Sequence, residues 1–285
     1  MKAVLFGASG LLGCAVLAEL NSAGYEVLSP SHAEMDITDE KKLSSYLAGI
    51  KPEVAINCAG FNYVDECESK PELAFKVNGE AVGNLARITN SIKALFFHIS
   101  SDYIFSGEKD DEYLEQDEPK PLSVYGESKL LGEKLAQKFA DKFCILRTSW
   151  LFGPARDNFI SKIVKRWKKG ETEFKIVSDQ QGKPTYSLDL ARVIRLAVEQ
   201  NLTGIYHFCN QGKISRYQLA KEVFEIIGEK PRIIPISAEQ YGAIAKRPKN
   251  SALCTEKIET ALKLTIRHHQ LAIKDYLEKI SGEIK

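Results

Sequence analysis

The chain has 285 residues, enough for one large or two modest domains, and 44% of them are hydrophobic, enough for a full core. A formal net charge of +1 excludes the strongly basic surface that binds nucleic acid or an anionic membrane, and no apolar run approaches the roughly 18 residues of a membrane span. The six cysteines lack Cys-x-x-Cys spacing and the five histidines lack metal-ligand spacing, so we expect free thiols in a reducing cytoplasm and no metal site.

The N-terminal segment predicts a strand over 3–6, a glycine-rich turn and a helix. Gly7, Gly10 and Gly13 allow a tight turn, close approach of the backbone to a pyrophosphate and close packing of helix on strand. The helix N-terminus also favours an anion. We predict that a dinucleotide cofactor contacts this turn at Gly7, Ser9, Gly10, Leu11, Leu12 and Gly13. A purely structural turn is the alternative, and the regular glycines and single Lys2 argue against a lipoprotein signal.

The second strand, expected over 25–28, ends without the acidic residue that NAD-preferring sites place on the ribose diol. Its end reads Ser-Pro-Ser-His, which leaves room for a 2′-phosphate that Ser31 or His32 would bond. This favours NADPH, with NADH as the alternative cofactor. Asp36 and Ile37 begin the next segment and join the predicted cofactor contacts.

The following segments continue the alternation of strand and helix. Strands are expected over 54–60, 94–99 and 143–146, helices over 39–48, 71–91 and from Ser123 onward, and a polar loop over 61–69. This alternation predicts an α/β fold with a Rossmann-like doubly wound parallel sheet. Ligands bind at the carboxyl ends of the strands of such sheets, so Cys58, Ala59 and Gly60 are predicted cofactor contacts, as is Asn78 on the next helix.

One predicted helix carries Tyr125 and Lys129, four residues apart and therefore on one face. A nearby ammonium lowers the pKa of a phenol, which favours proton transfer to a carbonyl oxygen while hydride arrives at carbon. Ser101, at the end of the preceding strand, can donate to the same carbonyl. About one Tyr-x-x-x-Lys is expected by chance, and Tyr217 with Lys221 reads as an ordinary helix pair. The surrounding strand ends favour the first pair.

From residue 151 the pattern changes. Helices are expected over 158–169, 187–199 and 215–228, strands over 174–177 and 204–208, a polar loop over 179–185, and short helices at the end. We expect an NAD(P)-binding domain formed by 1–150 with interleaved parts of about 187–210. The rest of 151–285 would form a small substrate-binding lid domain. Lys183 and Arg247 are candidate phosphate contacts there, with a solvated surface role as the alternative.

Seven sequence blocks carry a resemblance to a known family. They are the Gly7 turn, NCAGFNYVD from Asn57, SSDYIFSG from Ser100, YGESK from Tyr125, RTSWLFG from Arg147, DQQGKPT from Asp179 and RPKNS from Arg247. Together they resemble the extended short-chain dehydrogenase/reductases, and within that family the dTDP-4-dehydrorhamnose reductases. The resemblance covers nearly the whole chain, and its last three blocks are far more specific than the first.

The resemblance implies NADPH- or NADH-dependent reduction of the C4 ketone of dTDP-4-dehydro-6-deoxy-L-mannose (dTDP-4-dehydrorhamnose) to dTDP-L-rhamnose, a step of polysaccharide biosynthesis. It makes Ser101, Tyr125 and Lys129 the catalytic triad. Tyr125 would give its proton to the C4 alkoxide, Ser101 would align the carbonyl, and Lys129 would hold the nicotinamide ribose and tune the tyrosine. The implied sugar-pocket residues are Val64, Asp102, Tyr103 and Trp150.

The chain departs from the family pattern in two places. Ala59-Gly60-Phe61-Asn62 stands where the family usually has Ala-Ala-Tyr-Thr, and Phe105-Ser106-Gly107 stands where it has Phe-Asp-Gly. These departures bear on sugar preference rather than on the chemistry. Some members are magnesium-linked homodimers, which leaves a homodimer open here, although no metal cluster is visible in the sequence.

Two other functions stay open at this point. The first is another nucleotide-sugar enzyme on the same scaffold, either a different 4-ketoreductase or an epimerase that retains NAD between half-reactions. The second is a non-catalytic dinucleotide-binding subunit similar to the regulatory subunit of methionine adenosyltransferase. The intact Ser101, Tyr125 and Lys129 set does not exclude the second, but the Trp150 block favours a sugar pocket.

Overall fold

The first of two lobes is built on a six-stranded parallel sheet in the order β10-β5-β4-β3-β1-β2. The strands of this computed structural model, which describes residues 1–280, are β1 (Lys2–Phe6), β2 (Glu26–Leu28), β3 (Val54–Asn57), β4 (Leu95–Ser101), β5 (Phe143–Thr148) and β10 (Gly204–His207). Strand β2 lies on one side of β1, and β3, β4, β5 and β10 follow on the other side. The direction in which strands are added therefore reverses between β1 and β3. Such a reversal is where α/β sheets bind ligands. The predicted doubly wound fold is confirmed.

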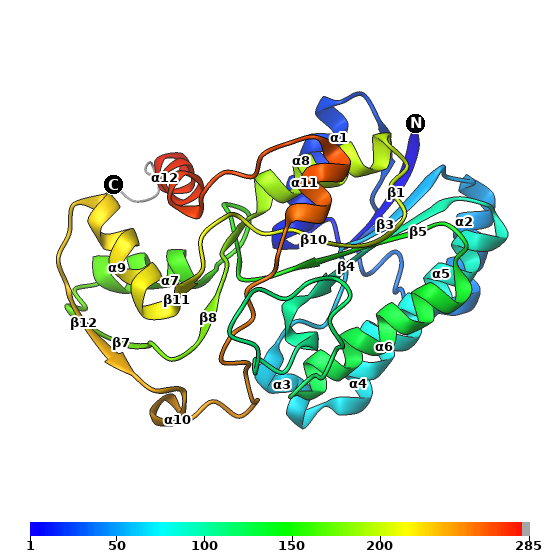
Figure 1. Cartoon of the computed structure of the whole chain (residues 1–285). Helices are drawn as coiled ribbons and strands as arrows, with labels where there is room; N and C mark the ends of the chain where they lie inside the picture. The colour runs from blue at the N-terminus through cyan, green and yellow to red at the C-terminus, as the bar shows by residue number, and fades with distance from the viewer. Residues whose placement is uncertain (281–285) are drawn as a thin grey trace.

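Helices cover both faces of this sheet (Figure 1). On one face lie α1 (Leu11–Ser22), α8 (Ser187–Glu199) and α11 (Glu256–Leu262), and on the other lie α2 (Glu40–Ile50), α5 (Ala81–Ser91) and α6 (Val124–Phe139). With both faces covered, strand residues of either orientation are buried, which explains why these strands read as continuous apolar runs rather than alternating ones.

The second lobe packs around a separate aromatic core that includes Phe174, Phe224 and Tyr276. Its helices are α7 (Phe159–Lys168), α9 (Arg216–Ile227), α10 (Ala238–Tyr241) and α12 (His269–Lys279). Its strands are β6 (Leu151–Phe152), β7 (Glu173–Val177), β8 (Gln181–Gly182), β9 (Thr185–Tyr186), β11 (Ile214–Ser215) and β12 (Arg232–Ile236). Because α8, β10 and α11 return to the first lobe, the chain crosses between the lobes several times (Figure 1).

Three expected segments differ from the structure. The polar loop over 61–69 contains a short helix, α3 (Val64–Ser69). The loop over 179–185 contains β8, which pairs with β11, and the start of β9, which pairs with β6. The single helix over 71–91 is α4 (Pro71–Phe75), a π-helical turn η1 (Lys76–Glu80) and then α5. Strand β12 had no predicted counterpart. The elements α3, β8 and β9 are too short for periodicity to reveal, and β12 depends on pairing with the distant strand β7.

Candidate functional site

A crevice lies beyond the carboxyl ends of β1 and β3. Gly7 has a φ of +78°, and a Cβ there would lie 2.5 Å from the backbone nitrogen of Ala59. A Cβ on Gly13 would lie 2.0 Å from the Gly7 carbonyl oxygen, so α1 packs directly on the turn. Gly10 is the N-cap of α1 and provides no side-chain cap, which leaves the helix N-terminus able to bind an anion.

The crevice contains a cavity of about 980 Å³. Of the predicted turn contacts, Ser9, Gly10 and Leu11 line it, whereas Leu12 packs into the core behind the turn. The other lobe contributes the basic residues Arg156, Lys162, Lys165 and Lys168. Arg156 was not predicted, and its Nε donates to the Ser9 carbonyl oxygen at 2.9 Å. An anion-binding helix end that faces basic side chains fits the diphosphate of a dinucleotide.

A carboxylate turns back onto Ser31, a predicted 2′-phosphate contact three residues beyond β2. The Ser31 amide and hydroxyl both donate to Glu34 Oε2 at 2.8 Å. These hydrogen bonds lower the pKa of the Glu34 carboxyl, which therefore stays charged. Glu34 lies six residues beyond the strand, so only the turn brings it back. Asp36 accepts from the Thr38 amide at 2.9 Å, and Ile37 is buried in the core.

The loop after β3 is held by Asn78, which occupies the π-helical turn. Asn78 is 1% exposed, accepts from the Phe61 amide at 2.8 Å and donates to Ser128 Oγ at 3.1 Å. It therefore tethers the loop to α6 instead of facing the crevice, where it was expected to meet the cofactor. Gly60 lines the crevice. Cys58 stays a thiol, because burial raises its pKa to about 12.

Ser101, Tyr125 and Lys129 come together between β4 and α6. Tyr125 lies in the first turn of α6 and is 8% exposed, and Ser101 ends β4. Burial raises the pKa of Tyr125, a hydrogen bond with Ser101 partly offsets this, and the charge of Asp102 adds to the rise. The Tyr125 hydroxyl also donates to Asn62 Oδ1 at 3.4 Å.

The structure corrects the expected effect of Lys129 on Tyr125. Its ammonium donates to the Ile99 carbonyl oxygen at 2.7 Å, and burial lowers the pKa of Lys129 to about 8. The largest effect on the Tyr125 pKa is burial, which raises it, and Lys129 does not lower it as expected. The phenol therefore stays protonated at neutral pH, as a proton donor must.

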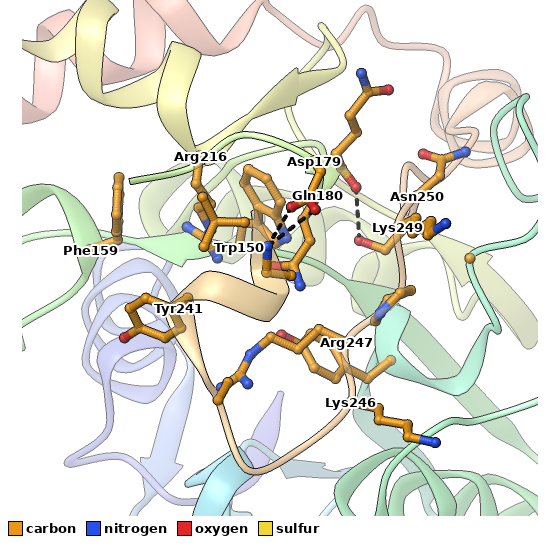
Figure 2. Close-up of a pocket in the computed structure, with 18 of the residues that line it drawn as sticks. Trp150, Phe159, Asp179, Gln180, Arg216, Tyr241, Lys246, Arg247, Lys249 and Asn250 are labelled. Carbon is orange, nitrogen blue, oxygen red and sulfur yellow. Dashed lines mark hydrogen bonds between the residues drawn. The ribbon is translucent and has the colours of Figure 1, made fainter. Parts of the chain in front are cut away.

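A second cavity, of about 1350 Å³, lies between the lobes, and Tyr103 is one of the residues that line it. Trp150, Arg216 and Arg247 also line it (Figure 2). The Trp150 backbone has a φ of +45°, a strained conformation for a bulky residue. Gly182 makes room for the indole, since a Cβ there would lie 2.6 Å from Trp150 Cε2. The Arg216 guanidinium lies 3.8 Å from the centroid of the Trp150 ring.

The remaining predicted substrate residues occupy different environments. Asp102 is 2% exposed and accepts from Ser101 Oγ at 3.0 Å, and Val64 packs near Tyr125. Arg247 lines the cavity but also pairs with Asp65 at 2.7 Å. Lys183 is buried and pairs with Glu112 at 2.5 Å, so its position does not support the expected phosphate contact.

Sequence reasoning missed Asn62, Asp65, Arg156 and Arg216 as site residues. Asn62 and Asp65 lie within the NCAGFNYVD block and carried no signal beyond that block. Arg216 follows Ser215, which caps α9 in a capping box, so its local context is that of an ordinary helix start. Within residues 1–280, no His, Cys, Asp or Glu cluster could hold a metal ion, and no helix is long and apolar enough to cross a bilayer.

Comparisons with known proteins agree with this geometry. The chain is 35% identical to spore coat polysaccharide biosynthesis protein SpsK of Bacillus subtilis, over 99% of this chain and 98% of that one. It is 36% identical to dTDP-4-dehydrorhamnose reductase of Aggregatibacter actinomycetemcomitans, over 96% and 97% respectively. The crystal structure of dTDP-4-dehydrorhamnose reductase from Bacillus anthracis in complex with NADP superposes with a TM-score of 0.94, at 32% identity, and covers 98% of this chain and 99% of that one. Residues 1–281 match the family described as RmlD substrate binding domain, and the chain belongs to that family.

Proposed function

We propose that this protein reduces the C4 ketone of dTDP-4-dehydrorhamnose to dTDP-L-rhamnose with NADPH, NADH being the alternative cofactor. The observation that carries the proposal is the position of Tyr125. It lies beside Ser101 and contacts both Asn62, which lines the crevice at the Gly7 turn, and Tyr103, which lines the Trp150 cavity. The names of several relatives at 31–36% identity support the substrate.

The chain's own groups have distinct tasks in this reaction. When bound in the crevice, NADPH supplies the hydride. The protonated Tyr125 hydroxyl donates its proton to the C4 oxygen, and Ser101 Oγ hydrogen-bonds the same oxygen and aligns the ketone. The Lys129 ammonium, one helical turn from Tyr125, would hold the nicotinamide ribose. The guanidinium of Arg216, beside Trp150, faces the charge of the substrate diphosphate.

We assign residues 1–150, with about 187–210, to the NAD(P)-binding domain and the rest of 151–285 to the substrate domain. Helix α11 packs against the first domain, although it lies in the second part of the chain. Location in the cytoplasm and assembly as a homodimer are further proposals, which fractionation and a mass measurement in solution would test.

The test is a panel of 4-keto sugar nucleotides assayed with NADPH and with NADH, followed by loss of the reduced cofactor's absorbance. We expect turnover of dTDP-4-dehydrorhamnose and near-complete loss of activity in Tyr125→Phe. Tyr217→Phe is the matched control, because Tyr217 belongs to the other Tyr-x-x-x-Lys pair and lies outside both cavities. Normal turnover by Tyr125→Phe, or no turnover of any keto sugar by the unaltered protein, would contradict the proposal.

A further inference from the structure

Asn62 and Gly60 form a packed unit next to Tyr125. The Asn62 carboxamide oxygen is the acceptor for the Tyr125 hydroxyl, at 3.4 Å. The same oxygen would lie 3.1 Å from a Cβ built on Gly60, and Asn78 Oδ1 would lie 3.2 Å from it. Both distances are tighter than ordinary contacts to a Cβ. A side chain at position 60 would therefore push the Asn62 carboxamide away from its present place.

The other side of this unit is fixed. Asn78 is buried and bonds the Phe61 amide and carbonyl at 2.8 and 3.0 Å, so it cannot yield to a side chain at position 60. Asn62 is exposed to the crevice, and its side chain can yield. The space that Gly60 leaves open is therefore the space that lets Asn62 reach Tyr125. Positions 60 and 62 are also two of those at which the chain departs from the pattern of the family it resembles.

The direction of the hydrogen bond determines its effect. A carboxamide oxygen can only accept, so Asn62 bonds the protonated phenol and has no donor at that atom for a phenolate. A hydrogen bond to the neutral form of an acid favours that form. Asn62 thus orients the Tyr125 hydroxyl toward the crevice. It also keeps the Tyr125 proton on the phenol until the substrate ketone replaces the Asn62 carboxamide as hydrogen-bond acceptor.

We propose that Asn62 is a positioning residue, which keeps the Tyr125 hydroxyl protonated and oriented between the two cavities. We further propose that Asn62 can do so only because position 60 is a glycine. This inference rests on the proposed reductase function. It adds a residue that acts through Tyr125 rather than on the substrate.

The experiment compares Asn62→Ala and Asn62→Asp with the unaltered protein, by following kcat/KM for the keto sugar against pH at saturating NADPH. Removing one neutral hydrogen bond should lower kcat/KM by about three- to tenfold in Asn62→Ala. The limb that belongs to Tyr125 lies above pH 10, because burial raises this pKa, and is distinct from a Lys129 limb near pH 8. The Tyr125 limb should move to lower pH in Asn62→Ala, because the neutral phenol loses its acceptor. It should move to higher pH in Asn62→Asp, because a negative charge favours the neutral phenol. Asn21→Ala, at an exposed position near the end of α1, is the control and should change neither.

A double-mutant cycle tests the role of Gly60. Gly60→Ala should lower kcat/KM in the unaltered background by nearly as much as Asn62→Ala does. In an Asn62→Ala background it should have a much smaller effect, because only the 3.2 Å contact with Asn78 Oδ1 remains. Additive effects of the two substitutions would overturn the role of Gly60, and an alkaline limb unmoved in both Asn62 variants would overturn the role of Asn62. No turnover by the unaltered protein would instead overturn the proposed function, so the two failures are distinguishable.

Discussion

Asp102 is a buried carboxyl directly beside the reacting groups. It accepts the Ser101 hydroxyl at 3.0 Å, and burial raises its pKa to about 6. An unfolded chain would show a value near 4. Because the folded pKa lies above the unfolded one, the native state binds more protons between these values. Asp102 therefore reduces the free energy of unfolding as pH rises from about 4 to 6, and the full penalty is present above pH 6.

We expect Asp102→Asn to be more stable and less active than the unaltered protein. Removing the buried charge should raise the free energy of unfolding by up to about 3 kcal/mol at pH 7.5, and by nothing below pH 4. Loss of the charged acceptor for Ser101 should lower kcat/KM about tenfold. Denaturant unfolding at the two pH values, with kinetics at pH 7.5, checks both. Equal stability changes at pH 4 and 7.5 would contradict the assignment.

Glu34 holds a negative charge against Ser31, which we predict to contact a 2′-phosphate. We expect Glu34→Gln to raise the ratio of kcat/KM for NADPH to that for NADH by about fivefold. Two like charges in contact repel each other by about 1 kcal/mol in water, and the substitution removes this repulsion for NADPH alone. Glu26→Gln is the control, because Glu26 is also exposed and lies at the start of β2. An unchanged ratio in Glu34→Gln would show that the phosphate lies elsewhere.

At the scale of elements, α6 carries the chemistry on one face. Tyr125, Lys129 and Gly132 follow one another at helical spacing, so the glycine lies on the same stripe as the two reacting groups. A Cβ on Gly132 would lie 2.2 Å from the Asn78 carbonyl oxygen. The helix can approach the π-helical turn only because that position lacks a side chain, and this approach sets the distance of Tyr125 from the crevice.

Gly132→Ala should therefore displace α6. We expect a loss of about 1–3 kcal/mol in the free energy of unfolding from overpacking, together with a fall in kcat. Gly49→Ala in α2 is the matched control, because a Cβ there meets nothing within 4 Å. That change should leave kcat unchanged and stabilise the helix by about 0.5–1 kcal/mol. Thermal unfolding and steady-state kinetics on the pair check the prediction, which equal effects of the two variants would contradict.

At the scale of the whole molecule, the substrate cavity depends on contacts between the lobes. Asp65 on α3 belongs to the first lobe, and its carboxylate accepts both the Arg247 guanidinium, at 2.7 Å, and the Ala245 amide, at 2.9 Å. Arg247 and Ala245 both line the cavity. One carboxylate therefore holds the segment that closes the cavity opposite Trp150. The ion pair lowers the pKa of Asp65, so the contact persists throughout the neutral range.

Asp65→Asn should release this segment. We expect KM for the nucleotide sugar to rise about tenfold, as the charge-assisted bonds to Arg247 are lost, and KM for NADPH to stay unchanged. Glu66→Gln is the control, because Glu66 pairs with Lys70 on the surface of the same helix. Steady-state kinetics with each substrate varied in turn checks the prediction. An equal rise in both KM values would indicate a general loss of structure.

The amino-acid sequence alone determined the wound sheet, the glycine-rich turn and the placement of Tyr125 and Lys129 on one face of a helix. Each is a local pattern, since buried parallel strands read as apolar runs and residues four apart on a helix share a face. Local patterns of this kind can be recognised in a sequence without knowing which distant segments they will contact. The resemblance of the chain also pointed to the reductase family, and the match over residues 1–281 confirms this.

Tertiary structure alone decided the electrostatics and the walls of the site. Burial reversed the expected direction of the Tyr125 pKa, and the turn after β2 brought the Glu34 carboxylate onto Ser31. Lys183 pairs with Glu112 and does not contact the substrate cavity. Arg216 packs on Trp150, although the two residues lie 66 positions apart in the chain. Desolvation and contact between distant segments depend on what surrounds a group in three dimensions, and no spacing along the chain encodes that.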